Sequence, residues 1–223
     1  MTPWIRLDLA QTPDGTRLEL MQRGDDFSIR ANGQLLMNSR VHGSEEALAE
    51  MALGALSERP TPDVLVGGLG CGYTLAAALS RLGPHATVSV AEIVPAVVRW
   101  NREHLGHLNG HPLGDARVRV IEADICELFR TPTQPFDAIL LDVDNGPRAV
   151  ARSSNSWLYT PTGLAAIYAT LRPRGVLALW SAGPEVGFSD RLRDAGFKVE
   201  LRRAKAHPSR TRQQHLIWLS TKA

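Results

Sequence analysis

The chain of 223 residues contains only two cysteines, Cys71 and Cys126. Two cysteines are too few for a disulfide framework and lack the spacing of metal ligands, so we expect both to be reduced thiols. No apolar run approaches the roughly 18 residues that cross a bilayer, and residues 1–10 lack the basic and then apolar layout of a signal peptide. These absences argue against a disulfide-rich secreted domain and a membrane protein, and they predict a cytoplasmic location.

A strong excess of either charge is also missing, because 25 Lys and Arg residues face 23 Asp and Glu residues. The basic residues are concentrated between positions 191 and 212, which would suit a phosphate-binding face. A solvated hairpin explains the same cluster, since Asp194 and Glu200 dilute it. Only Phe197 interleaves the basic run as an aromatic residue, which disfavours a stacking platform for single-stranded nucleic acid. We therefore expect no nucleic-acid partner.

The first part of the chain has the pattern of short strands. Apolar and polar residues alternate over 4–9, 16–21 and 27–30, and Gly paired with Asp or Asn separates these stretches as turns. The pattern predicts a small antiparallel β unit over residues 1–43. So small a sheet needs a packing partner to be stable.

A connecting helix follows over residues 44–61. Ser44 is the expected N-cap, Glu45 and Glu46 supply acids in the first turn, and apolar residues recur on one face as far as Leu56. The Pro60-Thr61-Pro62 sequence then breaks the helix and marks a boundary.

Residues 62–223 alternate between strand-like and helix-like segments, which predicts an α/β fold with a mostly parallel sheet and helices on both faces. The last two apolar runs are joined by a short polar segment and are expected to be antiparallel. The first expected strand begins at Val64, and the others span 86–91, 117–121, 136–141, 176–180, 197–201 and 216–219. The expected helices span 75–82, 95–105, 125–128 and 162–171.

A glycine-rich turn follows the first of these strands. Gly68, Gly70 and Gly72 give a G-x-G-x-G spacing that lets the backbone turn tightly and approach a ligand. Glu92 ends the next strand 24 residues after Gly68, close to the roughly 20 expected for an acid that accepts hydrogen bonds from ribose hydroxyls. This order predicts a nucleotide site. The alternative is a βα turn that binds nothing, with Glu92 as a helix N-terminal acid.

Further acids follow the next two strands, at the edge of the sheet where ligands bind in open α/β folds. Asp124 is placed to accept from an adenine amine while Ile125 packs on the ring, although Asp124 equally suits a helix cap. Asp142 and Asp144 leave an apolar strand beside a Gly-Pro turn, where they would bind a substrate ammonium and take its proton. Local turn formation is the alternative.

A metal site is disfavoured. His104, His107 and His111 superficially have ligand spacing, but no cysteine or carboxylate set accompanies them, so we expect surface histidines and no metal. The acidic turn likewise lacks further oxygen ligands for a metal ion.

Four motifs together resemble the spermidine synthase family, namely GGLGCGYT, VAEIVPAVVRWN, EAD and FDAILLDVDNGP. The similarity covers most of the chain and is closest to a bacterial spermidine-synthase-like branch. The resemblance implies a Rossmann-like methyltransferase fold with a seven-stranded sheet, an antiparallel last strand and a small N-terminal β unit. It also implies a homodimer.

The resemblance implies roles for individual residues. Gly68, Gly70 and Gly72 would flank the thionucleoside, Glu92 would hold the ribose, and Asp142 the reacting amine. Asp124 and Ile125 would contact the adenine. The family pattern is altered where Cys71 replaces an acid of the glycine loop, where the catalytic loop contains Val143 and Asn145, and where Glu45 and Glu46 stand near the place of an amine-binding tyrosine.

These observations predict a transferase that uses decarboxylated S-adenosylmethionine or S-adenosylmethionine and transfers an aminopropyl group to a small amine, with Asp142 as base and Asp144 as its electrostatic partner. One alternative is a methyltransferase, which a cationic or amide anchor for the donor carboxylate would favour. Another is a non-catalytic nucleoside-binding or dimerisation module. Four aromatic residues either line the pocket or fill the core, namely Trp100, Trp157, Tyr159 and Trp180.

Overall fold

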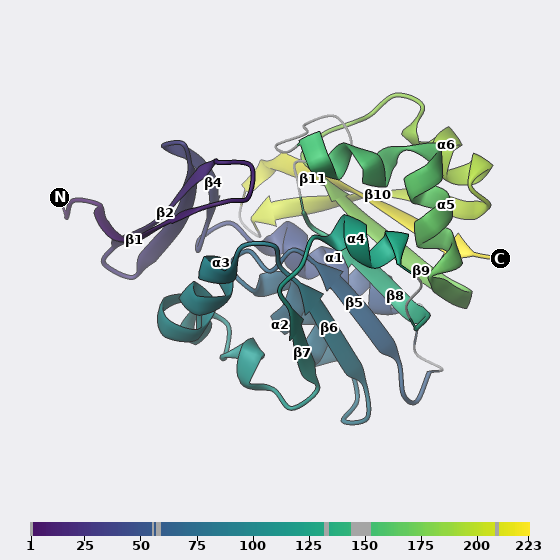
Figure 1. The fold of residues 1–223 in the computed structure, drawn as a ribbon, viewed down its shortest axis with the longest axis horizontal. Helices are drawn as coiled ribbons and strands as arrows, with labels where there is room; N and C mark the ends of the chain where they lie inside the picture. Colours follow the sequence, from purple (N-terminus) through teal and green to yellow (C-terminus); the bar gives the residue numbers. More distant parts are fainter. Residues whose placement is uncertain (1, 55, 57–58, 132–133, 144–152, 208–209) are drawn as a thin grey trace.

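The computed structural model describes residues 2–54, 56, 59–131, 134–143, 153–207 and 210–223. Their strands form a four-stranded antiparallel sheet near the N-terminus and a seven-stranded sheet that carries the helices (Figure 1). The expected α/β architecture with a small N-terminal β unit is confirmed. None of the helices in these ranges combines the length and the apolar character that a membrane crossing would take.

The larger sheet is parallel except for one strand. Its order is β10-β11-β9-β8-β5-β6-β7, in which β11 runs antiparallel to both of its neighbours. The pairs formed by β5 with β6 and β8, by β6 with β7 and by β8 with β9 are parallel. The strands are β5 (Asp63–Gly67), β6 (Thr87–Ala91), β7 (Val118–Ile121), β8 (Phe136–Leu141), β9 (Leu171–Ser181), β10 (Phe197–His207) and β11 (Arg210–Lys222).

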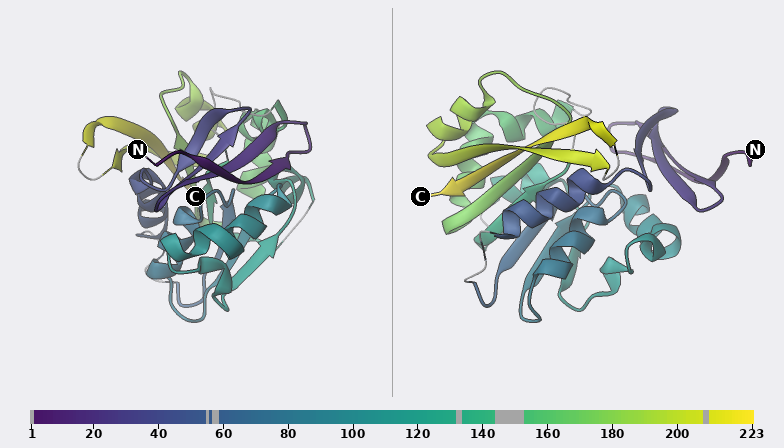
Figure 2. Two further views of the ribbon diagram at one scale, coloured as in Figure 1. Left: turned by 90° about the vertical axis from the view of Figure 1, so that its left-hand side faces the viewer. Right: turned by 180° about the vertical axis from the view of Figure 1, so that it is seen from behind.

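Helices cover both faces of this sheet because its central strands are apolar on both sides. In β5, Val64 and Val66 pack toward α1, α2 and α3, whereas Leu65 packs toward α4, α5 and α6. Figure 1 shows the second group in front of the sheet, and the rear view in Figure 2 shows α1 across the opposite face. The helices are α1 (Gly43–Gly54), α2 (Tyr73–Arg81), α3 (Pro95–Trp100), α4 (Ile125–Arg130), α5 (Pro161–Ala169) and α6 (Phe188–Asp194), with short helical turns at Asn101–Leu105, Gly106–Leu108, Pro112–Gly114 and Ser153–Tyr159.

The N-terminal sheet is a meander of four strands rather than the three that the alternation predicted. Leu20 and Ile29 are buried in the same apolar core as α1 and α2, so this sheet is docked on the larger one. The fourth strand escaped prediction because its Leu35-Leu36-Met37 run does not alternate with polar residues. The strands are β1 (Ile5–Gln11), β2 (Arg17–Arg23), β3 (Asp26–Ala31) and β4 (Gln34–Asn38).

Two expected helix boundaries are wrong. Helix α1 begins at Gly43, because the backbone N–H groups of Glu45 and Glu46 donate to the His42 carbonyl, and Ser44 is therefore inside the helix instead of capping it. The helix expected over 95–105 ends as an α-helix at Trp100 and continues as a π-helical turn. There the Asn101 side chain donates to the Val97 carbonyl and joins the backbone hydrogen bonding of the helix.

Candidate active site

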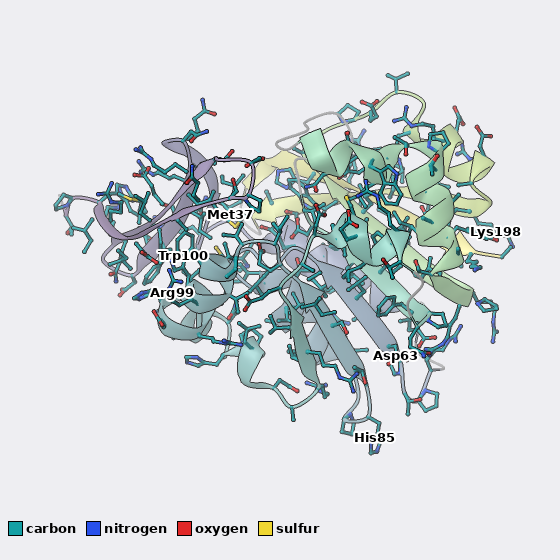
Figure 3. The ribbon with its side chains drawn as sticks, viewed as in Figure 1. Met37, Asp63, His85, Arg99, Trp100 and Lys198 are labelled. Carbon is teal, nitrogen blue, oxygen red and sulfur yellow. The ribbon has the colours of Figure 1, made fainter. Side chains whose placement is uncertain are left out.

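A pocket lies at the carboxyl ends of β5, β6 and β8, where the glycine loop, the ends of these strands and the N-terminal sheet meet. Parallel strands bring their following loops to one edge of a sheet, which explains why residues far apart in sequence share this pocket. The small sheet contributes residues such as Leu18 and Met37 to the wall and covers the glycine loop. Met37 projects from the small sheet toward the larger one (Figure 3).

The glycine loop turns sharply and packs closely against its neighbours. Gly68 has a φ of +85°, and a Cβ there would collide with the Asp142 carbonyl oxygen, so only glycine lets β5 and β8 end side by side. Gly68 and Gly70 both line the pocket. Gly72 instead faces the side chains of Asn101 and Asn109, which would lie 2.8 and 2.9 Å from an added Cβ.

Glu92 is buried at the base of the glycine loop. One carboxylate oxygen accepts from the Leu69 backbone N–H at 3.1 Å, and the other accepts from the Val94 N–H at 2.9 Å. Burial raises the pKa of Glu92, and these backbone N–H groups oppose that rise. Glu92 lines the pocket as well, so the same carboxylate holds the loop in shape and faces the space where a ribose was predicted.

Asp124 combines the two roles that the sequence left open. It is the N-cap of α4, accepting from the Cys126 backbone N–H at 2.8 Å, and it also lines the pocket. Ile125, the first residue of the helix, is buried and lines the pocket beside it. The capping bond fixes the direction of the carboxylate, so a ligand group would meet a preset acceptor.

Asp142 follows β8 and lies on the side of the glycine loop opposite to Glu92, since β5 lies between β8 and β6. Its Oδ2 accepts a hydrogen bond from the Thr74 hydroxyl at 2.9 Å. Burial raises the pKa of Asp142 to about 6, and the Thr74 bond counteracts part of that rise. Thr74 is a site residue that sequence reasoning missed, because a threonine in the first turn of a helix carries no motif of its own. Asp144 lies outside the described residues.

Glu45 enters the same pocket from the first turn of α1. Burial raises the pKa of Glu45 to about 7, and the nearby charge of Asp142 adds to the effect. The pocket also contains Cys71, whose thiol pKa is raised to about 12 by burial and by the two carboxylates. The thiol is therefore neutral, and the two carboxyl groups are the titratable groups that face each other here.

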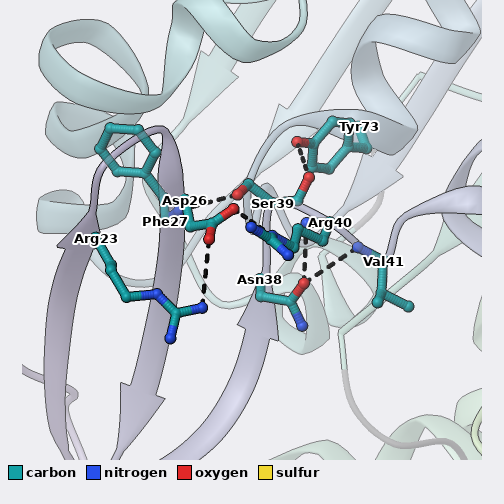
Figure 4. Close-up of polar contacts among 8 residues, drawn as sticks. All are labelled: Arg23, Asp26, Phe27, Asn38, Ser39, Arg40, Val41 and Tyr73. Atoms are coloured by element: carbon teal, nitrogen blue, oxygen red, sulfur yellow. Dashed lines mark hydrogen bonds and ion pairs between the residues drawn. The ribbon is translucent and has the colours of Figure 1, made fainter. Parts of the chain in front are cut away.

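The segment that leads into α1 is tied to the start of α2 (Figure 4). The Tyr73 hydroxyl donates to the Ser39 carbonyl at 3.0 Å, and the Asn38 side chain accepts from the Arg40 and Val41 backbone N–H groups. The His42 ring stacks on the Tyr73 ring with centroids 4.1 Å apart. These contacts fix the path of the chain just before Glu45 and hold its carboxylate over the pocket.

The predicted aromatic candidates separate into two groups. Trp180 lines the pocket. Trp100 is fully buried and donates its indole N–H to Asp8, and Tyr159 packs against Phe188 in the core. Trp157 lies under the guanidinium of Arg130, away from the pocket lining.

Of the three histidines expected at the surface, His107 and His111 are exposed and His104 is half-buried. His107 packs edge-on against Phe27, with ring centroids 5.5 Å apart, so the N-terminal sheet covers part of it. Within the described ranges, no group of three or more His, Cys, Asp or Glu side chains is arranged to hold a metal ion.

The pocket has a strongly one-sided charge. Four carboxyl groups line it, those of Glu45, Glu92, Asp124 and Asp142. No Lys, Arg or His side chain of the described residues lines it. Such a pocket favours a cationic ligand and repels an anionic one.

No protein-family model matches the chain. Two curated relatives from Streptomyces coelicolor are similar to it in sequence. Polyamine aminopropyltransferase 2 is 34% identical over 153 residues, or 65% of this chain, and polyamine aminopropyltransferase 1 is 30% identical over 165 residues, or 71% of this chain. The chain spans only 26% and 29% of the length of these two proteins.

Solved spermidine synthases have the same fold. One, crystallised in complex with the transition-state analogue AdoDATO, matches with a TM-score of 0.76 and 19% identity over 98% of this chain and 72% of its own. Spermidine synthase from Thermotoga maritima matches with a TM-score of 0.77 and 19% identity over 98% of this chain and 73% of its own. The predicted resemblance to the spermidine synthase family is confirmed, and the names of the curated relatives describe transferases of the predicted class.

Proposed function

We propose that the chain transfers an aminopropyl group from decarboxylated S-adenosylmethionine to a small amine. The observation that carries the proposal is the acidic pocket at the carboxyl ends of the strands, lined by four carboxyl groups and by no basic side chain of the described residues. Decarboxylated S-adenosylmethionine carries a sulfonium and an ammonium and no carboxylate. An amine acceptor is also cationic at neutral pH, since its pKa is near 10.

The same charge distribution disfavours methyl transfer from S-adenosylmethionine. That donor carries a carboxylate, which would enter a pocket of like charge without a cationic partner. Asn38 and Asn155 are the amide side chains of the described lining, and an amide offers a weaker partner for a carboxylate than a guanidinium does. The methyltransferase alternative is therefore less well supported than aminopropyl transfer.

Separate parts of the pocket suit the two halves of the donor. On the nucleoside side, Glu92 would accept from the ribose hydroxyls, Asp124 from the adenine amine, and Ile125 would pack on the ring. The bare backbone at Gly68 and Gly70 would allow close approach of the thionucleoside. The ammonium groups of donor and acceptor would then lie between Asp142 and Glu45, with Trp180 as an aromatic wall beside them.

The reaction is a direct displacement at carbon. The acceptor enters as an ammonium and gives one N–H proton to Asp142, which frees the nitrogen lone pair. That nitrogen attacks the methylene carbon by which the aminopropyl group is attached to the sulfonium. A C–N bond forms, and the bond from that carbon to sulfur breaks with its electron pair going to sulfur. Methylthioadenosine leaves as a neutral thioether, and the protein contributes alignment and proton removal.

Similarity to aminopropyltransferases in sequence, and to spermidine synthases in fold, supports this assignment. The test is a product assay. The purified protein is incubated with decarboxylated S-adenosylmethionine and a panel of linear diamines and polyamines, and methylthioadenosine and the aminopropylated amine are measured by mass spectrometry. Formation of both in equal amounts supports the proposal. Methylated product from S-adenosylmethionine would favour the methyltransferase alternative, and binding without any product would favour a non-catalytic module.

A further inference from the structure

A chain of hydrogen bonds leads away from the pocket on the side of Glu45. The Ser44 hydroxyl donates to Glu45 Oε2 at 2.7 Å, and His215 Nδ1 lies 2.8 Å from the Ser44 oxygen. Ser44 is fully buried, and His215 is partly exposed on β11. These three side chains therefore join a carboxylate in the pocket to an imidazole that meets solvent.

The fold brings α1 unusually close to the last two strands at this point. A Cβ on Gly43 would lie 2.9 Å from the Lys205 carbonyl oxygen and 3.3 Å from that of Ala206, so glycine permits the contact. Because Gly43 is the first residue of α1, this close approach places Ser44 beside His215, which pairs with Ala204 of β10. Ser44 thus has a hydrogen-bond partner on each side, Glu45 and His215, in place of a helix-capping role.

We infer that Glu45, Ser44 and His215 form a relay through which the proton taken from the acceptor amine leaves the pocket. The inference rests on the proposed function, because aminopropyl transfer to an ammonium releases one proton per turnover. Asp142 and Glu45 face the same pocket, so their carboxyl groups bind this proton as a pair. Glu45 is the member of the pair with a hydrogen-bonded route away from it.

Two arrangements of the same three groups account for every proton. With Glu45 ionised, His215 Nδ1–H donates to the Ser44 oxygen and the Ser44 O–H donates to the carboxylate. With Glu45 protonated, its O–H donates to Ser44 and the Ser44 O–H donates to Nδ1. Transfer along the second arrangement ionises Glu45, restores the Ser44 hydroxyl and makes His215 an imidazolium. The imidazolium then gives its Nε2 proton to water and the neutral ring tautomerises through solvent.

The groups around Glu45 and His215 leave the hydrogen bond to Ser44 as the route away from Glu45. Glu45 faces Asp142 in the loop after β8, Cys71 in the glycine loop and Tyr73 on α2, and Glu46 lies next to it on α1. None of these groups carries a positive charge, so none of them forms an ion pair with Glu45 that would replace its hydrogen bond with Ser44. Burial lowers the pKa of His215, so its imidazolium is a short-lived carrier that releases the proton to water readily. The ring of Trp180 meets that of His215 edge-on at 4.6 Å and holds it in place.

The test compares Ser44→Ala and His215→Gln with the wild type in the aminopropyl transfer assay. His85→Gln is the control, since His85 is exposed and lies far from the site (Figure 3). We expect kcat to fall about tenfold in both relay variants, below the 100-fold of a direct acid or base, with KM for donor and amine unchanged. The loss of kcat in the relay variants should be largest below about pH 7, where removing the proton from the amine is hardest. The H85Q control should have the kcat of the wild type at every pH.

A second measurement covers the case in which a relay variant fails to fold. Nitrogen-15 NMR of the His215 imidazole in the wild type should show a titration step that disappears in Glu45→Gln. Three results would each overturn the relay while leaving the proposed function intact. They are a wild-type kcat in both relay variants, a rise of KM alone, and a His215 titration curve that is the same in the wild type and in Glu45→Gln. Absence of aminopropylated product with the wild type would instead overturn the proposed function, and the relay with it.

Discussion

Glu45→Gln should stabilise the unliganded protein at neutral and alkaline pH. In the wild type, folding moves the Glu45 carboxyl from water into a pocket beside Asp142, which raises its pKa from 4.5 to about 7. A carboxyl whose folded pKa is raised keeps its contribution to stability below the unfolded pKa and loses it as the pH rises through the folded value. The glutamine variant has no charge to lose.

The size of the effect follows from the two pKa values. Because one pKa unit corresponds to about 1.4 kcal/mol, a rise from 4.5 to about 7 costs at most about 3.5 kcal/mol above pH 7. Partial exposure of the side chain reduces this figure, and we expect E45Q to gain about 1–2 kcal/mol at pH 8. The gain should vanish near pH 4, where Glu45 is protonated in both the folded and the unfolded chain.

Urea denaturation at several pH values between 4 and 8 measures this difference directly. Glu50→Gln is the matched control on the same helix, because Glu50 is about half exposed and pairs with Arg81 at the surface. Its free energy of unfolding should stay within about 0.5 kcal/mol of the wild type at every pH. If E45Q and the wild type differ by a constant amount across this range, Glu45 does not carry a strained charge and the account of the acidic pair is wrong.

Three further predictions concern the pocket and the assembly. Glu92→Ala should weaken the binding of methylthioadenosine by about 1.5–3 kcal/mol in isothermal calorimetry, because it removes a charged acceptor, and unchanged affinity would remove Glu92 from the nucleoside site. Asp142→Asn should abolish transfer while the affinity for methylthioadenosine stays within twofold of the wild type, so full turnover would exclude Asp142 as base. We also propose a homodimer in which the second copy covers the exposed Leu35 of the N-terminal sheet. Leu35→Asp should then shift the sedimentation coefficient to that of a monomer. An unchanged sedimentation coefficient would exclude Leu35 from the interface.

The order of strands and helices in the larger sheet could be predicted because each apolar stretch has a clear boundary. The β8 strand ends at Leu141, as its run of apolar residues indicates, and Gly67 ends β5 where the glycines begin. The exceptions have local physical causes. The Asn101 side chain adds a hydrogen bond to the Val97 carbonyl at the change from α-helix to π-helix. Helix α1 begins at Gly43 because the Glu45 and Glu46 backbone N–H groups donate to the His42 carbonyl.

The candidate site was predictable where a residue follows a strand, and less so elsewhere. Glu92, Asp124 and Asp142 follow the ends of three parallel strands, so topology alone gathers them. Thr74 and His215 lie inside a helix and a strand, and their place in the site depends on which neighbours the packing supplies. The hydrogen bond between Ser44 and His215 joins residues 171 positions apart in the sequence, and no local sequence pattern predicts it.

Binding of decarboxylated S-adenosylmethionine and S-adenosylmethionine, measured side by side by isothermal calorimetry, tests the central claim most directly. The two ligands share the nucleoside and the sulfonium and differ in one carboxylate. The acidic pocket predicts that the decarboxylated form binds at least about tenfold more tightly, equivalent to about 1.4 kcal/mol, and that Glu45→Gln narrows the difference. Equal affinities, or tighter binding of S-adenosylmethionine, would contradict the assignment of this pocket to a dicationic donor.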